Sequence, residues 1–154
     1  HIIMGTYSKA LGGFGAYVAG SQRLVDYLVN AARSFIYSTA LPPAVTAANL
    51  AAVELCLDGL DRGRELLDKA ERFRATLAEQ GWRTRGDSQI VPLLVGESEN
   101  ALRLGRELQE HDFLAVPVRP PTVPEGQARL RFSLSWAHEQ TDLDALTGAL
   151  DELR

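Results

Sequence analysis

Near the start of the chain stands the stretch that decides its fold, Gly5-Thr6-Tyr7-Ser8-Lys9-Ala10-Leu11-Gly12-Gly13-Phe14-Gly15-Ala16-Tyr17-Val18-Ala19-Gly20. An apolar run, Ile2-Ile3-Met4, leads into it and predicts a buried strand, because short apolar runs bounded by turn residues are typical of core strands. We therefore predict two strands within residues 1–20, joined by a loop that contains one lysine and a cluster of glycines.

The lysine in this loop has the surroundings of a reactive amine. The next lysine along the chain is Lys69, and the residues around Lys9 are mostly apolar residues, serines and glycines. We expect the Lys9 amine to be desolvated, which disfavours the ammonium form and leaves the nucleophile that forms imines. The hydroxyls of Thr6 and Ser8 can bind an anion such as a phosphate ester, together with backbone N–H groups left bare by Gly12, Gly13 and Gly15.

An amine beside a phosphate cradle suits a cofactor that carries both an aldehyde and a phosphate, and pyridoxal 5'-phosphate is such a cofactor. The alternative is a strand–turn–strand in which the glycines serve sharp turns and Lys9 is solvated.

Two other motifs are incomplete. Thr6-x-x-Lys9 lacks the serine and the companion motifs of penicillin-recognising enzymes. Gly12-Gly13-Phe14-Gly15 lacks the Gly-Lys-Ser/Thr ending of a P-loop.

Three stretches of the chain resemble the α-oxoamine synthases, a family of pyridoxal-phosphate enzymes with the aspartate-aminotransferase fold (fold type I). In chain order they are Thr6–Gly12 with Gly15–Gly20, Arg33–Ala44, and Arg119–Pro124 with Gly126 and Ala128–Arg131. The resemblance covers essentially the whole chain, with the motifs at similar spacing. It implies an α/β fold, and the absence of a starting methionine suggests the C-terminal portion of a larger polypeptide.

A shift in composition near residue 60 predicts a domain boundary, because Gly59 and Gly63 punctuate the chain there and charged residues become frequent afterwards. The resemblance implies that residues 1–60 are the end of the large cofactor-binding domain and contain the cofactor lysine. Residues 61–154 are then a small C-terminal α/β domain, in which we expect a mostly antiparallel sheet backed by helices.

In the first part, we predict a helix that is capped by Ser21 and runs to about Arg33. Residues 35–39 are expected to be extended. A helix is expected over residues 44–57, with Pro42-Pro43 at its start, where a missing N–H is harmless. This second helix is apolar all round, which predicts burial against another layer or subunit.

Periodicity predicts the elements of the second part. We expect three helices. The first covers residues 64–80 and is ended by Gly81, the second is capped by Ser98, and the third begins at Thr141. Strands are expected over residues 90–95, 114–118 and 129–136, with Pro92 at an edge or a bulge. The residues predicted to face the core are Leu66, Ala70, Phe73 and Leu77, then Ala101, Leu104 and Leu108, then Leu130, Phe132, Leu134 and Trp136, and finally Leu143, Leu146, Leu150 and Leu153.

The resemblance implies a cofactor site in the first part. Lys9 is the implied catalytic residue, which holds the cofactor as a Schiff base and later moves protons at the substrate Cα. Thr6 matches a threonine that binds the cofactor phosphate, and Ser8 has a weaker claim to the same role. Ser38 and Thr39 match a region that reaches the phosphate of the neighbouring subunit's cofactor, which implies a homodimer with a shared active site.

Substrate binding is implied in the second part. The resemblance implies that Arg119 binds the amino-acid carboxylate. Arginine suits bidentate binding of a carboxylate, and the following prolines fix its backbone. Thr122 matches a substrate-binding threonine. Arg129 and Arg131 lie on the polar face of their strand. We interpret them as structural or solvated residues, and the alternative is that either helps to bind substrate.

The reaction implied by the resemblance is a decarboxylative condensation of an amino acid with an acyl thioester. The likeness is greatest to members that join L-alanine to pimeloyl-CoA or a pimeloyl-carrier protein in biotin biosynthesis. Other members of the family remain alternatives: glycine C-acetyltransferase, 5-aminolevulinate synthase and serine palmitoyltransferase. A structural or dimerisation fragment without activity is a further alternative.

Composition supports a globular protein and argues against several other classes. The 154 residues are 45% hydrophobic and 23% charged with a net charge of −4, and the arginines are scattered, which disfavours a nucleic-acid partner. Cys56 is the only cysteine and is expected to be a small core residue. His111 and His138 are isolated, so no metal site is predicted. We find no secretory signal or membrane-spanning run in the sequence, which predicts a cytoplasmic protein.

Overall fold

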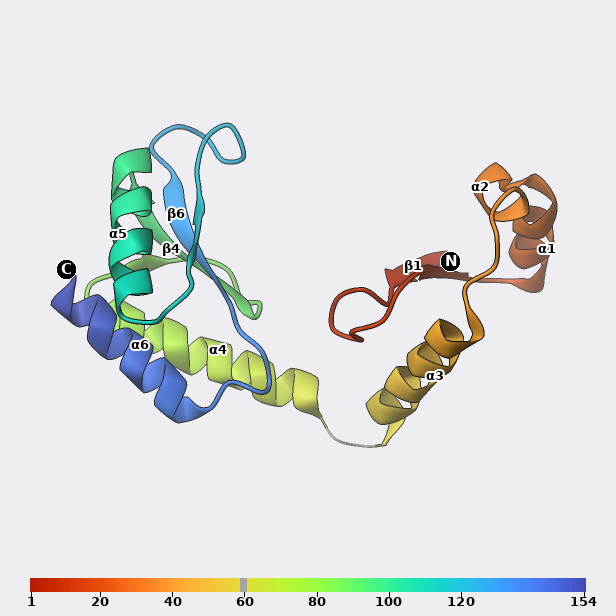
Figure 1. Cartoon of the computed structure of the whole chain (residues 1–154), viewed down its shortest axis with the longest axis horizontal. Helices are drawn as coiled ribbons and strands as arrows, with labels where there is room; N and C mark the ends of the chain where they lie inside the picture. The colour runs from red at the N-terminus through yellow and green to blue at the C-terminus, as the bar shows by residue number, and fades with distance from the viewer. Residues whose placement is uncertain (59–60) are drawn as a thin grey trace. The chain divides into compact units, whose positions relative to one another are not determined.

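The computed structural model describes residues 1–58 and 61–154. By its internal contacts the chain divides into two compact units, His1–Leu60 and Asp61–Arg154, which we call unit 1 and unit 2 (Figure 1). The boundary predicted near residue 60 falls on Gly59 and Leu60, which lie outside the described residues.

Unit 1 begins with the predicted hairpin. Strand β1 (Ile3–Thr6) pairs antiparallel with β2 (Ala16–Ala19), and Thr6 lies opposite Ala16 at the end of the ladder next to the connecting loop. The burial expected for the entering strand is wrong for this unit, because Ile2, Ile3 and Met4 are between 61% and 69% exposed. A two-stranded ribbon has no second layer of its own to cover such side chains.

Two helices follow the hairpin. Helix α1 (Gln22–Ala31) is capped as predicted, since the Ser21 hydroxyl accepts a hydrogen bond from the Leu24 amide at 3.4 Å. The extended segment expected over residues 35–39 is wrong at its start, where α2 (Arg33–Ile36) forms a short helix. The Tyr37 amide donates to the Arg33 carbonyl, and the Ser38 hydroxyl donates to the Ser34 carbonyl, so local hydrogen bonds close this turn.

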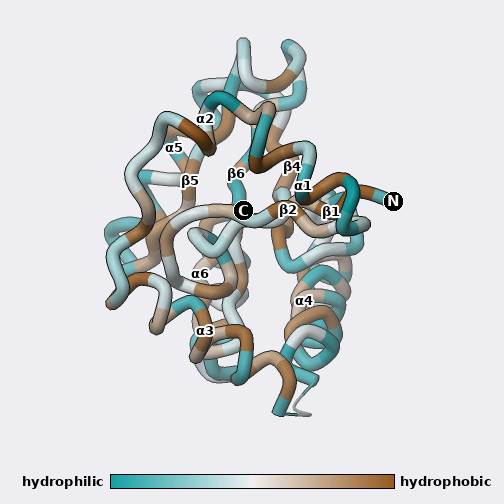
Figure 2. The backbone as a smooth tube through the Cα atoms, turned by 90° about the vertical axis from the view of Figure 1, so that its right-hand side faces the viewer, coloured by the Kyte–Doolittle hydropathy of each residue, from teal (hydrophilic) through white to brown (hydrophobic). Residues whose placement is uncertain are grey.

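Helix α3 (Pro43–Leu57) starts at a proline, as predicted. Figure 2 shows hydrophobic stretches along it, but Asn49 is its buried residue, while Leu50 and Leu55 are exposed. Cys56 is likewise exposed and is not the predicted core residue. The described part of unit 1 does not supply the layer that an apolar helix requires on every side.

Unit 2 contains a four-stranded sheet in the order β3-β4-β6-β5, and every pairing is antiparallel, as expected. Its strands are β3 (Arg83–Thr84), β4 (Ile90–Gly96), β5 (Val116–Val118) and β6 (Ala128–Ser133). Pro92 lies on an inner strand, and the register shift comes later, between Leu94 and Gly96. The sheet tolerates this proline because β3 is short and pairs with Leu93 and Leu94 but not with Pro92.

Three helices complete unit 2: α4 (Arg62–Glu79), α5 (Ser98–Glu110) and α6 (Gln140–Glu152) (Figure 1). Their predicted inner faces join the sheet in one hydrophobic cluster, in which the Phe73 and Phe132 rings meet edge to face at 5.6 Å. The predicted core residues are confirmed with few exceptions: Leu66 and Leu153 are only partly buried. Gly81 follows α4 with φ +82°, which glycine adopts without strain, and ends the helix as predicted.

Trp136 is the clearest exception to the predicted core. It lies beyond the end of β6 and is 48% exposed. Its indole N–H donates to Glu65 Oε2 at 2.6 Å, and the Arg62 guanidinium lies 5.6 Å from the ring centroid. Trp136 therefore makes a polar contact with α4, although the alternating pattern of the sequence predicted that it faces the core.

The other boundaries differ by one or two residues. Ser98 is the first helical residue of α5 and Glu97 is the N-cap, so the predicted serine cap is wrong. Helix α6 is capped by Glu139, which forms a reciprocal capping box with Asp142. Leu114 is 88% exposed and precedes β5. Among the described residues no single helix is long and apolar enough to cross a membrane.

Candidate active site

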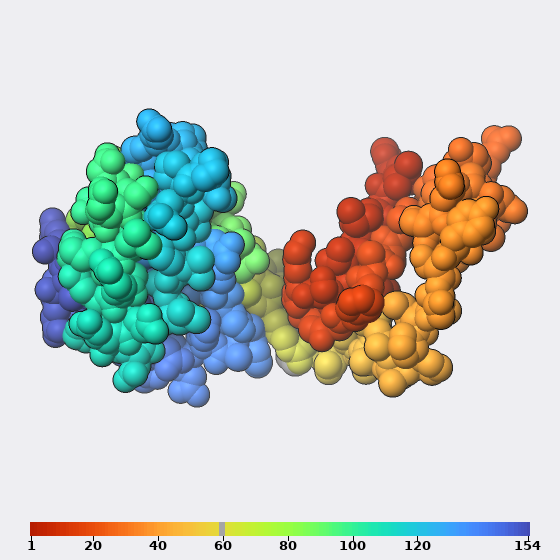
Figure 3. Space-filling view, turned by 45° about the horizontal axis from the view of Figure 1, so that its top comes forward, coloured from red at the N-terminus to blue at the C-terminus, as the bar shows by residue number. Residues whose placement is uncertain are grey.

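The lysine loop, residues 7–15, joins β1 to β2 and lies at the surface of its unit (Figure 3, red). Two hydrogen bonds close its base: the Tyr7 amide donates to the Gly15 carbonyl at 3.0 Å, and the Gly13 amide donates to the Tyr7 carbonyl at 2.7 Å. At the tip, the Gly12 amide donates to the Lys9 carbonyl at 3.0 Å, and φ of Gly12 is +60°. The sequence therefore folds here into a turn that requires glycine and presents Lys9.

Two expectations for this loop are wrong. The amides of Gly12 and Gly13 are not bare, because both donate to carbonyls within the loop. An anion at the tip would have to use side-chain donors in their place. The Lys9 side chain is exposed rather than desolvated, since no described residue of this unit covers it.

Three polar side chains remain available at the hairpin end. Thr6 is half-buried at the end of β1, while Ser8 and Lys9 are exposed. Within residues 1–58 and 61–154, the structure records no hydrogen bond or ion pair from the side chain of any of the three. A nucleophilic amine beside two neutral hydroxyl donors is a donor set that fits pyridoxal 5'-phosphate, whose aldehyde takes an amine and whose phosphate takes hydrogen bonds.

Sequence reasoning missed the residue that supports the loop from below. Asn49 on α3 is buried, and its Nδ2 donates to the Phe14 carbonyl at 2.9 Å. A Cβ built on Gly13 would lie 2.0 Å from Asn49 Oδ1, so the glycine backbone packs directly against this amide. The signal in the sequence was a single asparagine in an apolar helix, because a buried polar group needs a hydrogen-bond partner.

The hairpin is also braced by aromatic residues. The rings of Tyr7 and Tyr17 lie 5.4 Å apart at an interplanar angle of 52°. A Cβ on Gly5 would lie 2.6 Å from the Tyr17 hydroxyl oxygen, so the ring covers the β1 backbone at that position. Aromatic cross-strand contacts of this kind stabilise a short ribbon.

Ser38 and Thr39, the residues expected to reach a second cofactor, follow α2. The Ser38 hydroxyl is occupied by the Ser34 carbonyl, and Thr39 is exposed. The structure records no hydrogen bond between either residue and the lysine loop among the residues it describes.

In unit 2, the predicted substrate-binding residues share one tight turn. The Thr122 amide donates to the Arg119 carbonyl at 3.0 Å, and the peptide bond between Pro120 and Pro121 is cis. This is the geometry of a type VI turn. Arg119 and Thr122 are both exposed, so the turn presents the two side chains from neighbouring points of a fixed backbone.

Next to this turn is a groove on the face of the sheet that points away from the core. Arg129 and Arg131 of β6 line it, together with Arg85 and with Val118 and Val123, which flank the turn. Arg129 donates from Nε to the Gln127 carbonyl at 3.0 Å, which restrains its guanidinium, whereas Arg131 is exposed. We call this the arginine groove; its charge suits a carboxylate or another anion.

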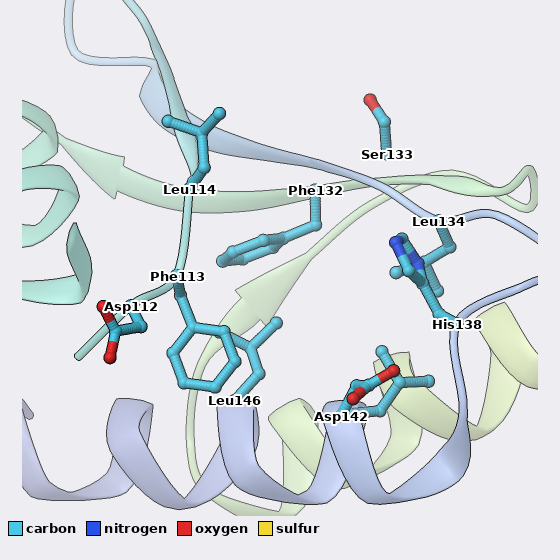
Figure 4. Close-up of a pocket in the computed structure, with 10 residues that line it drawn as sticks. Asp112, Phe113, Leu114, Phe132, Ser133, Leu134, His138, Asp142 and Leu146 are labelled. Carbon is cyan, nitrogen blue, oxygen red and sulfur yellow. The ribbon is translucent and has the colours of Figure 1, made fainter.

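A cavity of about 350 Å³ opens elsewhere in unit 2, between the loop before β5, the end of β6 and the start of α6 (Figure 4). Phe113, Phe132 and Leu146 contribute apolar walls, and His138 lies at the rim. The His138 Nδ1 accepts a hydrogen bond from the Ser135 amide at 3.1 Å, so this imidazole has a partner within its own loop. None of the predicted binding residues lines the cavity, and it lies outside the candidate site.

The chain is similar to curated proteins along nearly all of its length. It is 56% identical over 151 residues to a putative 8-amino-7-oxononanoate synthase of Bordetella parapertussis, covering 97% of this chain and 38% of that protein. It is 49% identical over 153 residues to the 8-amino-7-oxononanoate synthase of Gluconacetobacter diazotrophicus, covering 98% of this chain and 38% of that protein. The chain thus spans well under half the length of these relatives.

Solved structures share the fold. An 8-amino-7-oxononanoate synthase from Francisella tularensis superposes with a TM-score of 0.81 at 29% identity, covering 97% of this chain and 43% of that chain. A serine palmitoyltransferase from Sphingomonas wittichii superposes with a TM-score of 0.91 at 23% identity, covering 98% and 39%, which establishes the fold alone. The fold is therefore that of the fold-type I transferases. The family model of aminotransferase class I and II matches residues 1–150, and the chain belongs to this family.

Proposed function

We propose that the protein carrying this chain is a pyridoxal-phosphate-dependent acyltransferase. It condenses L-alanine with a pimeloyl thioester, either pimeloyl-CoA or a pimeloyl-carrier protein, and releases carbon dioxide and the thiol. The product is 8-amino-7-oxononanoate, for biotin biosynthesis. The observation that carries the proposal is the exposed Lys9 amine, which has no recorded partner among the described residues and follows two hydroxyl residues, Thr6 and Ser8, on a glycine turn. The relatives' names support the choice of reaction.

The cofactor, when bound, supplies an electron sink that eases bond breaking at the substrate Cα. Lys9 would hold the cofactor through its aldehyde, and the Lys9 amine would take and return the proton at the substrate Cα. The hydroxyls of Thr6 and Ser8 would donate hydrogen bonds to the cofactor phosphate without adding charge. In the proposed homodimer, Ser38 and Thr39 serve the neighbouring subunit's phosphate, for which the Ser38 hydroxyl must leave the Ser34 carbonyl.

Arg119 binds the α-carboxylate of the amino acid, and Thr122 contributes a hydroxyl beside it. The turn that joins them holds the backbone from which the Arg119 side chain projects. Bidentate binding by the guanidinium would set the direction of the carboxylate bond that breaks when carbon dioxide leaves. The arginine groove offers two further cations next to the turn, Arg129 and Arg131. We further propose that unit 1 is the end of the large cofactor-binding domain and unit 2 is the small domain.

Covalent trapping tests the cofactor role. The full-length protein is incubated with pyridoxal 5'-phosphate, reduced with borohydride and mapped by peptide mass spectrometry. We expect a reduced pyridoxyl adduct on the peptide with Lys9, absent in Lys9→Ala and retained in Lys69→Met. Lys69 is the matched control, because it is the other lysine of this chain and its ammonium donates to the carbonyls of Trp136 and His138. A folded, cofactor-supplied protein without an adduct on Lys9 would refute the proposal.

Turnover with different amino acids tests the substrate. The full-length protein is assayed with L-alanine, glycine and L-serine, each with pimeloyl-CoA, acetyl-CoA, succinyl-CoA and palmitoyl-CoA. We expect 8-amino-7-oxononanoate from L-alanine and pimeloyl-CoA as the dominant product. A preference for glycine or serine would move the protein to another member of the α-oxoamine synthases and leave the role of Lys9 intact.

A further inference from the structure

Asn49 stands out among the residues of α3 because it is the polar, buried one. The helix is otherwise rich in alanine, leucine and valine, and Asn49 is 6% exposed. Its Nδ2 donates at 2.9 Å to the carbonyl of Phe14, 35 positions away in the sequence. Burying an amide in an apolar helix lowers stability unless it is hydrogen-bonded, so this side chain is held toward the lysine loop by its one recorded bond.

The other end of the same amide is packed against the loop backbone. Asn49 Oδ1 is buried without a hydrogen-bond partner among the described residues, and an ideal Cβ on Gly13 would lie 2.0 Å from it. A residue with a side chain therefore does not fit at position 13 unless Asn49 moves. The amide thus contacts two consecutive residues of the loop, Gly13 by packing and Phe14 by a hydrogen bond.

These two contacts are connected to the loop tip through two backbone hydrogen bonds. The Gly13 amide donates to the Tyr7 carbonyl, and the Tyr7 amide donates to the Gly15 carbonyl. Lys9 follows Tyr7 by two residues and begins the tight turn that Gly12 closes, because the Gly12 amide donates to the Lys9 carbonyl. A displacement at Gly13 and Phe14 therefore moves both strands of the loop from which Lys9 projects.

We infer that Asn49 is a positioning residue of the lysine loop. It fixes the Gly13–Phe14 backbone, and through the Gly13–Tyr7 and Tyr7–Gly15 hydrogen bonds it sets where the Lys9 amine is presented. The consequence for imine formation rests on the proposed function, whereas the effect on the loop itself does not. A reaction that needs the amine within reach of a fixed aldehyde depends steeply on such placement.

The test uses the full-length protein with Asn49→Asp, which replaces the Nδ2 donor by an acceptor that faces the Phe14 carbonyl. Asn49→Ser is the second variant, with a side chain too short to reach and no added charge. Asn30→Asp and Asn30→Ser are matched controls, because Asn30 Nδ2 also donates to a backbone carbonyl, that of Asp26 at 2.7 Å, on the exposed helix α1. Circular dichroism establishes that each variant is folded.

The first measurement is hydrogen exchange of the Tyr7 and Gly13 amides in the cofactor-free protein, compared with the amides of α1. We expect exchange at Tyr7 and Gly13 to be about tenfold faster in the Asn49 variants and unchanged within about twofold in the Asn30 variants. Tenfold is the factor that corresponds to losing a hydrogen bond worth about 1.4 kcal/mol. Loop exchange within about twofold of wild type, or equal acceleration throughout α1, would overturn the inference.

The second measurement is the rate at which the cofactor absorbance band of the Lys9 adduct appears, as a function of cofactor concentration. We expect the maximal rate to fall about tenfold in the Asn49 variants, with a half-saturating concentration changed by less than about threefold. A merely structural role would leave the maximal rate of folded protein unchanged, and that result would also overturn the inference. If wild type forms no Lys9 adduct, the proposed function fails, and loop exchange alone decides the role of Asn49.

Discussion

Adding one methyl group at Gly13 should disrupt the support of the lysine loop. The new Cβ would lie 2.0 Å from Asn49 Oδ1, 3.2 Å from its Cγ and 3.3 Å from Tyr7 Cβ. Ordinary contacts with a Cβ begin near 3.4 Å, so the Asn49 amide has to move by more than an ångström. That movement breaks its 2.9 Å hydrogen bond to the Phe14 carbonyl.

The cost follows from two terms. Overpacking a closely packed site costs about 1–3 kcal/mol, and losing the hydrogen bond adds about 1 kcal/mol. We therefore expect Gly13→Ala to lower the free energy of unfolding by about 2–4 kcal/mol. Urea denaturation of the full-length protein, followed by circular dichroism, measures this change.

Two companion variants make the test specific. Gly148→Ala in α6 is the matched control: an ideal Cβ there has nothing within 4 Å, so alanine should stabilise the helix by about 0.5–1 kcal/mol. Combining Gly13→Ala with Asn49→Ala gives the methyl group room, so the double variant should be destabilised by less than the sum of the two single changes. Additive effects, or a Gly13→Ala variant as stable as wild type, would refute the close packing of Asn49 against this glycine.

Two further predictions concern unit 2. Leu130 is fully buried in the middle of the sheet, so Leu130→Ala should destabilise the protein by about 2–5 kcal/mol in thermal denaturation. The control is Leu114→Ala, at an 88% exposed position, which should change stability by less than about 0.5 kcal/mol. Arg119→Lys should raise the KM for the amino acid by about tenfold or more in steady-state kinetics, because lysine cannot reproduce a bidentate contact to a carboxylate; an unchanged KM would remove Arg119 from the substrate site.

The local pattern of the sequence was enough to predict most elements of this protein. The inner faces of α4, α5 and α6, and the alternation along β6 and the following Leu134, follow from periods of 3.6 or 2 in hydrophobicity, because these periods reflect backbone geometry within one element. The hairpin follows from an apolar run bounded by glycines. The lysine, its glycine turn and the prolines that fix the backbone after Arg119 were also visible, since each is a short contiguous motif.

The tertiary structure decided what depends on distant residues. The amide of Asn49 reaches Phe14 across 35 positions, and Trp136 leaves the core for Glu65 across 71 positions. The strand order β3-β4-β6-β5 and the exposure of Lys9 and of α3 belong to the same class. A periodic pattern states which side of an element is apolar, but it contains no information on which other segment covers that side, because this pairing arises only when the chain folds back on itself.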